Sequence, residues 1–418
     1  MIPRRLRLPG AGLALAALVV LSCADRSRRN PLDAGASDPL DLASPLRALA
    51  GDGQVELHWD FSRFEDVRGV RLYRESGDST LTRELPATDT SFVDRSVTNG
   101  RIYSYRIALD VTGEPELAIA GEHLATPGPE RVWVADGGSG LVWRLTPDGR
   151  QGLFARGYFP SLSAVAIDGE TGDCWVGDGS IGLYRITDDG VVHPVESTLE
   201  EAGATVIDAD GRTGWAVSAS GRRVYRFSVA AIADTLSLVE LDAAFSDSVG
   251  LALGAAGSLW VADGPGERVL HVDAAGVRLG EWRGLEGIVD VDPVAGECCQ
   301  AWALIAGGNG LLRLLPEGGL EERELPFAPA LQMDVDSRTG DLWIAGEGGI
   351  AALEPDGGAL RHWPEAAAGR GVVIDGVNEQ LWVVEETELS KITLGGLTYR
   401  ARLTGFTSIV QVAVDPGR

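Results

Sequence analysis

One short phrase recurs along most of the chain, and its spacing constrains the fold more than any other feature. Its cleanest copy is Leu259-Trp260-Val261-Ala262-Asp263. The phrase and its relatives hold seven tryptophans, at Trp133, Trp175, Trp215, Trp260, Trp302, Trp343 and Trp382. Successive tryptophans are 42, 40, 45, 42, 41 and 39 residues apart. A period of about 40 residues in strand-forming sequence with glycine-rich turns is typical of a four-stranded blade repeated in a ring.

Each repeat divides into four strands joined by turns. In one unit the apolar or alternating runs cover residues 164–168, 174–178, 182–186 and 191–195, with turns rich in Gly and Asp between them. The first tryptophan strand has no first strand before it, whereas a first-strand pattern, Ile409–Asp415, stands near the end of the sequence. We therefore expect the C-terminal segment to complete the blade begun at Arg131, which closes the ring and removes its open edge.

The order of these motifs resembles that of NHL-type and related β-propellers, over residues 128–418. The matching pattern is apolar-Asp, turn, Trp-Val-Ala-Asp, turn, Arg-apolar and Asp-Gly. The resemblance implies a seven-bladed β-propeller. The recurring tryptophans are expected to fill the space between blades, and the recurring aspartates and glycines to close tight turns by satisfying backbone N–H groups.

Residues 44–126 form a separate unit of short alternating runs. The runs at residues 54–59, 69–73, 90–94 and 102–108 each predict a strand. The segment resembles a fibronectin type III domain in Trp59, in the Val-Arg-Leu-Tyr-Arg run that starts at Val70, and in Gly100-x-x-Tyr103, where a tyrosine corner would lie. The resemblance implies a β-sandwich that serves as a spacer or an adhesion surface. Two prolines and a glycine within residues 126–129 mark its end, so the whole fold is expected to be all-β.

The N-terminal segment has the features of a targeting signal. Three arginines precede an apolar run over residues 11–21, which is too short to span a bilayer as a helix. The run ends in Val20-Leu21-Ser22-Cys23, which resembles a bacterial lipoprotein signal. The resemblance implies removal of residues 1–22, acylation of Cys23 and anchoring through several acyl chains. A secretory signal with a chance cysteine is the alternative.

The residues after Cys23 continue this interpretation. Residues 23–43 follow neither secondary-structure period, which predicts a flexible tether between the lipid and the first domain. Ala24 stands where an Asp would favour retention at the inner membrane, so the expected address is the outer membrane of a bacterial envelope.

The charge of the chain excludes one class of partner. The formal net charge is −25, with 61 acidic against 36 basic residues. Loss of residues 1–22 removes three arginines and no acid, so the mature chain becomes still more acidic. Such a surface repels nucleic acid and anionic lipid head groups. The membrane is therefore expected to be reached through the N-terminal lipid only.

Candidate binding residues gather on one face of the predicted ring. Turns between second and third strands should share a face with connections from fourth to first strands. The turns carry the acids Asp136, Asp178, Asp263, Glu347 and Glu386. The connections carry Tyr158, Phe159, Phe245, Arg283, Phe327, Arg370 and Phe406. An acidic rim interleaved with aromatics could hold a sugar, a cationic peptide or Ca²⁺. The competing interpretation makes the aspartates turn caps and the aromatics packing residues.

The sequence favours binding over catalysis. The five histidines lie in the sandwich segment or in predicted third and fourth strands, and none is paired with a Ser or Cys or spaced for a metal. We therefore expect a lipid-anchored envelope protein whose propeller recognises a protein or a glycan, without a required cofactor. A calcium-assisted hydrolase or lactonase is the alternative, on a resemblance of fold alone. A purely structural scaffold is the third possibility.

Overall fold

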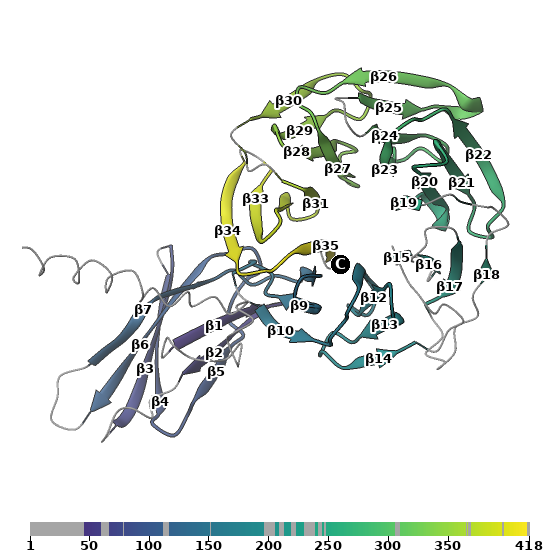
Figure 1. Ribbon diagram of the computed structural model, residues 1–418. Helices are drawn as coiled ribbons and strands as arrows, with labels where there is room; N and C mark the ends of the chain where they lie inside the picture. The colour runs from purple at the N-terminus through teal and green to yellow at the C-terminus, as the bar shows by residue number, and fades with distance from the viewer. Residues whose placement is uncertain are drawn as a thin grey trace, which may run out of the picture.

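The computed structural model describes residues 46–59, 67–77, 79–111, 117–150, 152–195, 205–208, 213–218, 223–229, 239–240, 245, 248–305, 310–364, 366, 369–394 and 397–415. The signal segment, Cys23 and the tether lie outside these residues. The described chain forms a two-sheet sandwich followed by a ring of sheets (Figure 1). Within the described ranges, no helix is long and apolar enough to cross a membrane.

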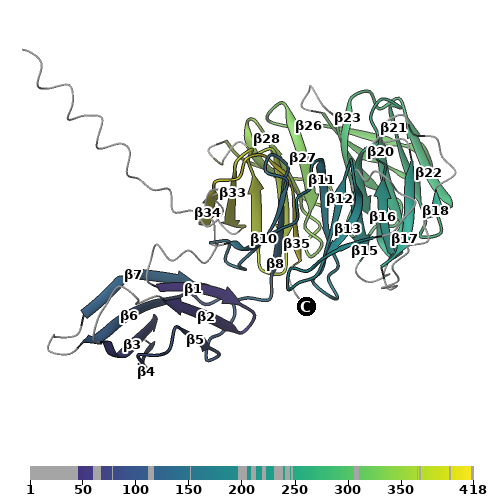
Figure 2. The same cartoon turned by 60° about the horizontal axis from the view of Figure 1, so that its bottom comes forward.

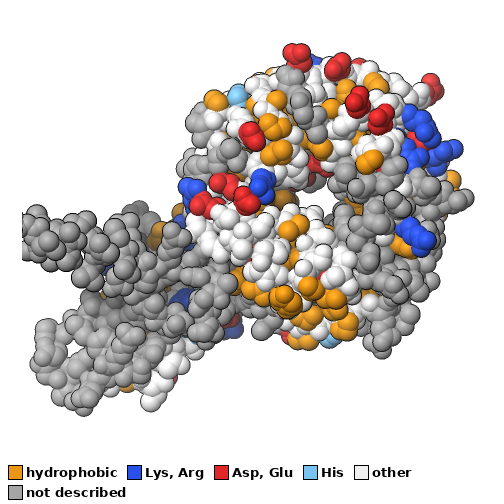
Figure 3. Space-filling model, viewed as in Figure 1, with side chains coloured by type: hydrophobic (Ala, Val, Ile, Leu, Met, Phe, Trp, Pro, Cys, Tyr) orange, Lys and Arg blue, Asp and Glu red, His pale blue; other side chains and the backbone are white. Residues whose placement is uncertain are grey.

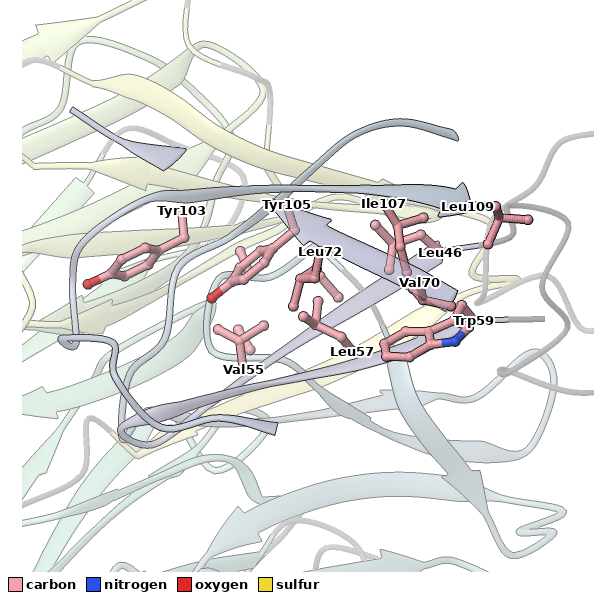
Figure 4. Packing of buried hydrophobic residues seen from close by; sticks show 13 residues of the cluster. Leu46, Val55, Leu57, Trp59, Val70, Leu72, Tyr103, Tyr105, Ile107 and Leu109 are labelled. Atoms are coloured by element: carbon pink, nitrogen blue, oxygen red, sulfur yellow. The ribbon is translucent and has the colours of Figure 1, made fainter. Parts of the chain in front are cut away.

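The first unit is a β-sandwich. One sheet contains β1 (Leu46–Gly51), β2 (Gln54–Trp59) and β5 (Ser91–Asp94). The other contains β4 (Ser79–Pro86), β3 (Val67–Ser76), β6 (Tyr103–Val111) and β7 (Leu117–Ala125), in that order. Alternate residues of β2 point inward, and their side chains meet those of β3 and β6 in the core (Figure 4). The Tyr103 hydroxyl accepts a hydrogen bond from Thr98 N at 2.8 Å, the contact expected of a tyrosine corner. The predicted sandwich is confirmed.

The second unit is a seven-bladed β-propeller, as predicted. The first three blades are β8 (Arg131–Asp136), β9 (Leu141–Leu145) and β10 (Gly152–Arg156) with β35 (Ile409–Asp415); β11 (Leu162–Ile167), β12 (Cys174–Asp178), β13 (Gly182–Ile186) and β14 (Val192–Pro194); and β15 (Thr205–Asp208), β16 (Thr213–Val217), β17 (Val224–Ser228) and β18 (Val239–Glu240). The fourth and fifth are β19 (Ser248–Leu253), β20 (Leu259–Asp263), β21 (Arg268–Val272) and β22 (Arg278–Arg283); and β23 (Ile288–Pro293), β24 (Ala301–Ile305), β25 (Gly310–Leu314) and β26 (Leu320–Glu324). The last two are β27 (Ala330–Val335), β28 (Leu342–Gly346), β29 (Gly349–Leu353) and β30 (Leu360–Trp363); and β31 (Gly371–Asp375), β32 (Gln380–Val384), β33 (Glu388–Thr393) and β34 (Thr398–Thr404). Two short 3-10 turns, η1 (Ala255–Gly257) and η2 (Pro316–Gly318), complete the described elements.

The repeated tryptophans hold the blades together. Each lies in the second strand of its blade, and all seven side chains are buried, at 0–2% exposure. Their indoles belong to the apolar clusters that fill the propeller, so the predicted structural role of the repeat is confirmed.

The ring closes between the two ends of the propeller. β35 pairs antiparallel with β8, from Ile409 opposite Asp136 to Asp415 opposite Arg131. An ion pair of 2.9 Å between Arg131 Nη1 and Asp415 Oδ2 adds to this seam. The C-terminal strand is therefore the innermost strand of the first blade, as the sequence predicted.

The innermost strands are edge strands, and side chains from neighbouring blades satisfy their backbone N–H groups. Carboxylate or amide oxygens on one innermost strand accept from the next: Asp290 from Met333 N at 3.0 Å, Asp292 from Val335 N at 2.9 Å, Gln332 from Val372 N at 2.7 Å, Asp334 from Ile374 N at 2.7 Å, and Gln411 from Val165 N at 3.1 Å. These bonds cap edges that no ladder covers. Burial raises the pKa of Asp290 and of Asp334 to about 7, and it also raises the pKa of Asp292.

Figure 2 shows the sandwich beside the end of the propeller where the chain passes from one unit to the other. Hydrogen bonds join the two units there. Gly128 N donates to Gly51 O at 3.0 Å, and Arg47 Nη2 donates to Gly152 O at 2.9 Å. Glu130, at the start of the propeller, is ion-paired with Lys391, and both side chains are buried. Glu130 Oε1 also accepts from Trp382 Nε1 at 2.8 Å. Burial raises the pKa of Glu130 to about 7, although the Lys391 charge opposes this shift.

Candidate functional site

The candidate site is the face of the propeller that carries the turns between second and third strands, which we call the loop face. Figures 1 and 3 look onto it. The connections between successive blades reach the same face, because Asp178 in a β12–β13 turn bonds Ser161 of the preceding connection. The sandwich contacts Asp148 and Gly152, in or beside the β9–β10 turn, which lies at the opposite end of the blade (Figure 2). The loop face is therefore not covered by the sandwich.

Asp178 shows how a loop on this face is built. Its side chain is 0% exposed, at the end of β12. It accepts from Ser180 N at 2.8 Å and Ile181 N at 3.0 Å, which closes its own turn. It also accepts from Ser161 N at 2.9 Å, and Gly179 N donates back to Ser161 O at 2.8 Å. One buried carboxylate thus fixes both a turn and the connection that enters the same blade.

Asp136 holds a turn and a connection together in the same way, at the place where the ring closes. It is 2% exposed and accepts from Ser408 N at 2.8 Å and from Thr407 N at 3.1 Å. Its carboxylate also accepts from Ser139 Oγ at 2.7 Å. Asp263, 0% exposed, accepts from Gly266 N at 3.2 Å and pairs with Arg268 at 3.0 Å.

The expectation that these aspartates form an exposed acidic rim is wrong for Asp136, Asp178 and Asp263. Their oxygens point into the protein because backbone N–H groups of the turns and connections need acceptors there. The competing interpretation as turn caps is the one that the geometry supports.

The predicted aromatic positions divide in the same way. Phe159 is 1% exposed and packs edge-on against Tyr184, with ring centroids 5.4 Å apart. Phe406, at 3% exposure, belongs to the cluster between the last blade and the first. Phe245 and Phe327 are likewise buried. These phenylalanines hold the connections on the blades, and a ligand at the surface cannot reach them.

Five predicted site residues remain exposed, in different blades or connections. Tyr158 is 75% exposed, and Glu347 is exposed at the β28–β29 turn. Arg370 pairs with Glu386 at 3.0 Å, and Arg283 pairs with Glu281 at 2.6 Å. The loop face therefore does not gather these residues into one charged pocket.

Most titrating groups of the propeller with a shifted pKa lie away from this face; an exception is Glu385 in the β32–β33 turn, whose pKa is raised by burial. Asp290, Asp292 and Asp334 are on the innermost strands, where burial raises the pKa of each. His271 stacks on Trp260 with ring centroids 3.9 Å apart, and burial lowers its pKa to about 4. Among the described residues, no group of three or more His, Cys, Asp or Glu side chains could hold a metal ion.

Sequence reasoning missed an uncharged surface formed by four segments, 136–140, 157–161, 178–182 and 406–410, which we call the platform. Apart from the buried Asp136 and Asp178, none of their residues carries a charge. Tyr158, Val410 and Ile181 are exposed by 75%, 46% and 42%. Hydrophobic side chains gather over β10 and β12–β14 on this face, while acidic and basic ones gather over the last blade, near β33 and β34, and over blades farther round the ring (Figure 3). The absence of charge in these segments was visible in the sequence, but their proximity was not.

Comparisons with known proteins assign neither a family nor a function to the chain. No family model matches the chain. An amylopullulanase from Thermoanaerobacterium saccharolyticum is 34% identical over 108 residues, which covers 24% of this chain and 8% of that protein. An amylopullulanase from Thermoanaerobacterium thermosulfurigenes is 33% identical over 107 residues, covering 24% and 6%. The chain thus spans less than a tenth of the length of these relatives.

Solved structures of similar shape are distant in sequence. A streptogramin B lyase has a TM-score of 0.48 and 16% identity, covering 58% of this chain and 83% of that one. The virginiamycin B lyase of Staphylococcus aureus has a TM-score of 0.49 and 16% identity, covering 68% and 91%. A chain of the nidogen–laminin complex has a TM-score of 0.46 and 11% identity, covering 69% and 100%. The strand pairing itself defines the class: a β-sandwich joined to a seven-bladed β-propeller.

Proposed function

We propose that this protein is a recognition module of the bacterial envelope, in which the propeller binds a protein or a glycan without transforming it. The N-terminal segment would be cleaved before Cys23, and the acylated Cys23 would hold the protein in the outer membrane. The tether and the sandwich would then carry the loop face away from the bilayer.

The observation that supports binding is the rigidity built into the loop face. Buried Asp136 and Asp178 each join a turn to a neighbouring connection through backbone hydrogen bonds. Loops that are already ordered lose little conformational entropy when a partner binds, so more of the contact energy appears as affinity. A row of such loops on a closed ring is suited to recognition of a partner by shape.

The binding function can be tested with the full chain immobilised through an affinity tag added at its C-terminus. Solubilised envelope proteins and envelope glycans are passed over it separately, with and without a metal chelator. We expect saturable binding of one class that soluble protein competes for and that the chelator leaves unchanged. Consumption of the bound partner, or loss of binding in the chelator, would instead favour the calcium-assisted hydrolase. Failure of every envelope fraction to bind would favour the structural scaffold.

The proposed acylation of Cys23 and the membrane localisation are tested separately. A Cys23→Ser variant, expressed beside the unmodified chain in cells fed labelled palmitate, should lose the label and leave the membrane fraction. Label or membrane association that persists in the Cys23→Ser variant would contradict acylation at this position.

A further inference from the structure

We infer that the platform binds an uncharged saccharide, with Tyr158 as the residue on which a sugar ring stacks. This inference rests on the proposed function, because it takes the loop face to be the recognition surface, and it specifies both the contact area and the class of partner. Four observations carry it: the continuity of the platform, its lack of charge, its size and the setting of Tyr158.

The four segments form one continuous surface. Gly137 N donates to Ser408 O at 2.9 Å, which joins segment 406–410 to segment 136–140. Phe159 N donates to Gly140 O at 2.8 Å, which joins segment 136–140 to segment 157–161. Gly179 N donates to Ser161 O at 2.8 Å and so adds the fourth segment. The platform is thus one continuous set of hydrogen-bonded loops that extends across the last, first and second blades.

Glycines keep this surface flat. A Cβ atom at Gly137 would come within 2.4 Å of Val410 Cγ2, and one at Gly138 within 2.7 Å of Thr407 Cγ2. At Gly140, where φ is +68°, a Cβ atom would lie 3.3 Å from the Tyr158 ring. The Tyr158 ring therefore lies along a backbone floor, while 75% of the side chain remains accessible. A ring held in this way offers an aromatic surface at low cost in rotamer entropy.

The absence of charge selects the partner. The chain carries 61 acidic residues and a net charge of −25, yet the nine exposed residues of the platform include no charged side chain. They are instead Gly, Ser, Thr, Tyr, Pro, Ile and Val. The platform itself offers a cationic peptide no carboxylate, and the neighbouring Glu386, whose backbone oxygen accepts from Ile409 N, is already paired with Arg370 at 3.0 Å. An acidic molecule would be repelled by the chain as a whole. A neutral saccharide meets neither obstacle.

The size of the platform also favours a saccharide over a protein. A stable protein interface uses about 20–30 residues on each side, well above the nine exposed on the platform. A few sugar units need only an aromatic ring and nearby hydrogen-bonding groups. The C–H groups on one face of a sugar ring carry slight positive charge and match the negative face of a tyrosine ring. The exposed Ser161, Ser180 and Thr407 add hydroxyl groups that can exchange hydrogen bonds with those of the sugar.

The experiment measures binding of uncharged oligosaccharides to the full chain by titration calorimetry. The probes are maltohexaose, cellohexaose, laminarihexaose and chitohexaose. The variants are Tyr158→Ala, Tyr158→Phe and, as a matched control, Val377→Ala. Val377 is 60% exposed in the β31–β32 turn, at the opposite end of its blade from the loop face. The melting temperature of each variant checks that the fold is retained.

We expect at least one probe to bind the unmodified chain, and Tyr158→Ala to weaken it at least tenfold. Tyr158→Phe should stay within about threefold because the ring is kept, and Val377→Ala should not change the affinity. Equal affinity of Tyr158→Ala would overturn the platform as the contact area and leave the recognition function standing. Binding of an envelope protein, but of no saccharide, in a Tyr158-dependent manner would overturn the class of partner. If neither saccharides nor envelope fractions bind, the inference and the proposed function both fail.

Discussion

Replacement of the buried Asp178 by alanine tests how the loop face is held. The side chain accepts three backbone hydrogen bonds, from Ser161 N, Ser180 N and Ile181 N, at 2.8–3.0 Å. Hydrogen bonds to a charged group contribute about 1.5–3 kcal/mol each, and we take about 1 kcal/mol because water can reach donors near the surface. Asp178→Ala should therefore lower the free energy of unfolding by about 3 kcal/mol. For a unit of this size that corresponds to a fall in Tm of about 6–12 °C.

The assay is thermal and urea unfolding followed by tryptophan fluorescence, which reports on the propeller because nine of the ten buried indoles of the described residues lie there. Asp178→Asn keeps one acceptor oxygen and should lose about half as much stability. Glu347→Ala is the matched control, an exposed acid in a turn of the same face, and should change stability by less than about 0.5 kcal/mol. If Asp178→Ala lowered the free energy of unfolding no more than Glu347→Ala, the buried carboxylates would not be holding the turns and connections in place, and the account would be refuted.

Three further predictions concern the innermost strands, the joint between sandwich and propeller, and the closure of the ring. The folded pKa values of Asp290 and Asp334, about 7, lie above the ordinary value of 3.8, so the folded protein binds more protons between these limits. The free energy of unfolding should therefore fall as the pH rises from about 4 to about 7, by up to about 1.4 kcal/mol per pH unit for each group. Asp290→Asn should make this pH dependence weaker in urea titrations. A free energy of unfolding that rises over the same pH range would contradict the prediction. Lys391→Met should lower the free energy of unfolding by about 3–5 kcal/mol at pH 8, because it leaves the Glu130 carboxylate buried without its ion-pair partner. A Glu130→Gln, Lys391→Met double variant should recover much of this loss. A double variant no more stable than Lys391→Met would contradict the role given to the ion pair. Deletion of residues 409–418 removes the inner strand of the first blade and should abolish the cooperative unfolding transition of the ring, so an intact transition in calorimetry would show that closure does not depend on β35.

The architecture could be predicted because it repeats. A pattern read seven times averages out the irregularity of any single blade, and the position of Ile409–Asp415 left one place for the closing strand. The strand at residues 54–59 was predicted at the bounds it has in the structure, since its alternation matches a sheet with one buried face.

The site was harder to predict, because an Asp at the end of a strand has the same sequence signal whether it points outward or inward. Asp136 and Asp178 turn inward since neighbouring connections bring N–H groups to them from 271 and 17 residues away. The pairing of Glu130 with Lys391 spans 261 residues and has no local pattern at all. Its one signal was that Lys391 is the single lysine of the chain. Contacts between loops that are distant in sequence depend on how the closed ring brings them together. The periodicity of the sequence predicts the order of the strands but not these contacts.

Backbone hydrogen exchange in the platform tests the central claim most directly, because it reports whether the loops of the recognition surface are held in place. In the unmodified protein, the amides of Ser161, Ile181 and Ser408 should exchange at least a hundredfold more slowly than in an unstructured peptide. In Asp178→Ala, Ser161 and Ile181 should lose this protection, while Ser408, which bonds to Asp136, keeps it. Exchange of all three amides at the rate of a free loop in the unmodified protein would contradict the account.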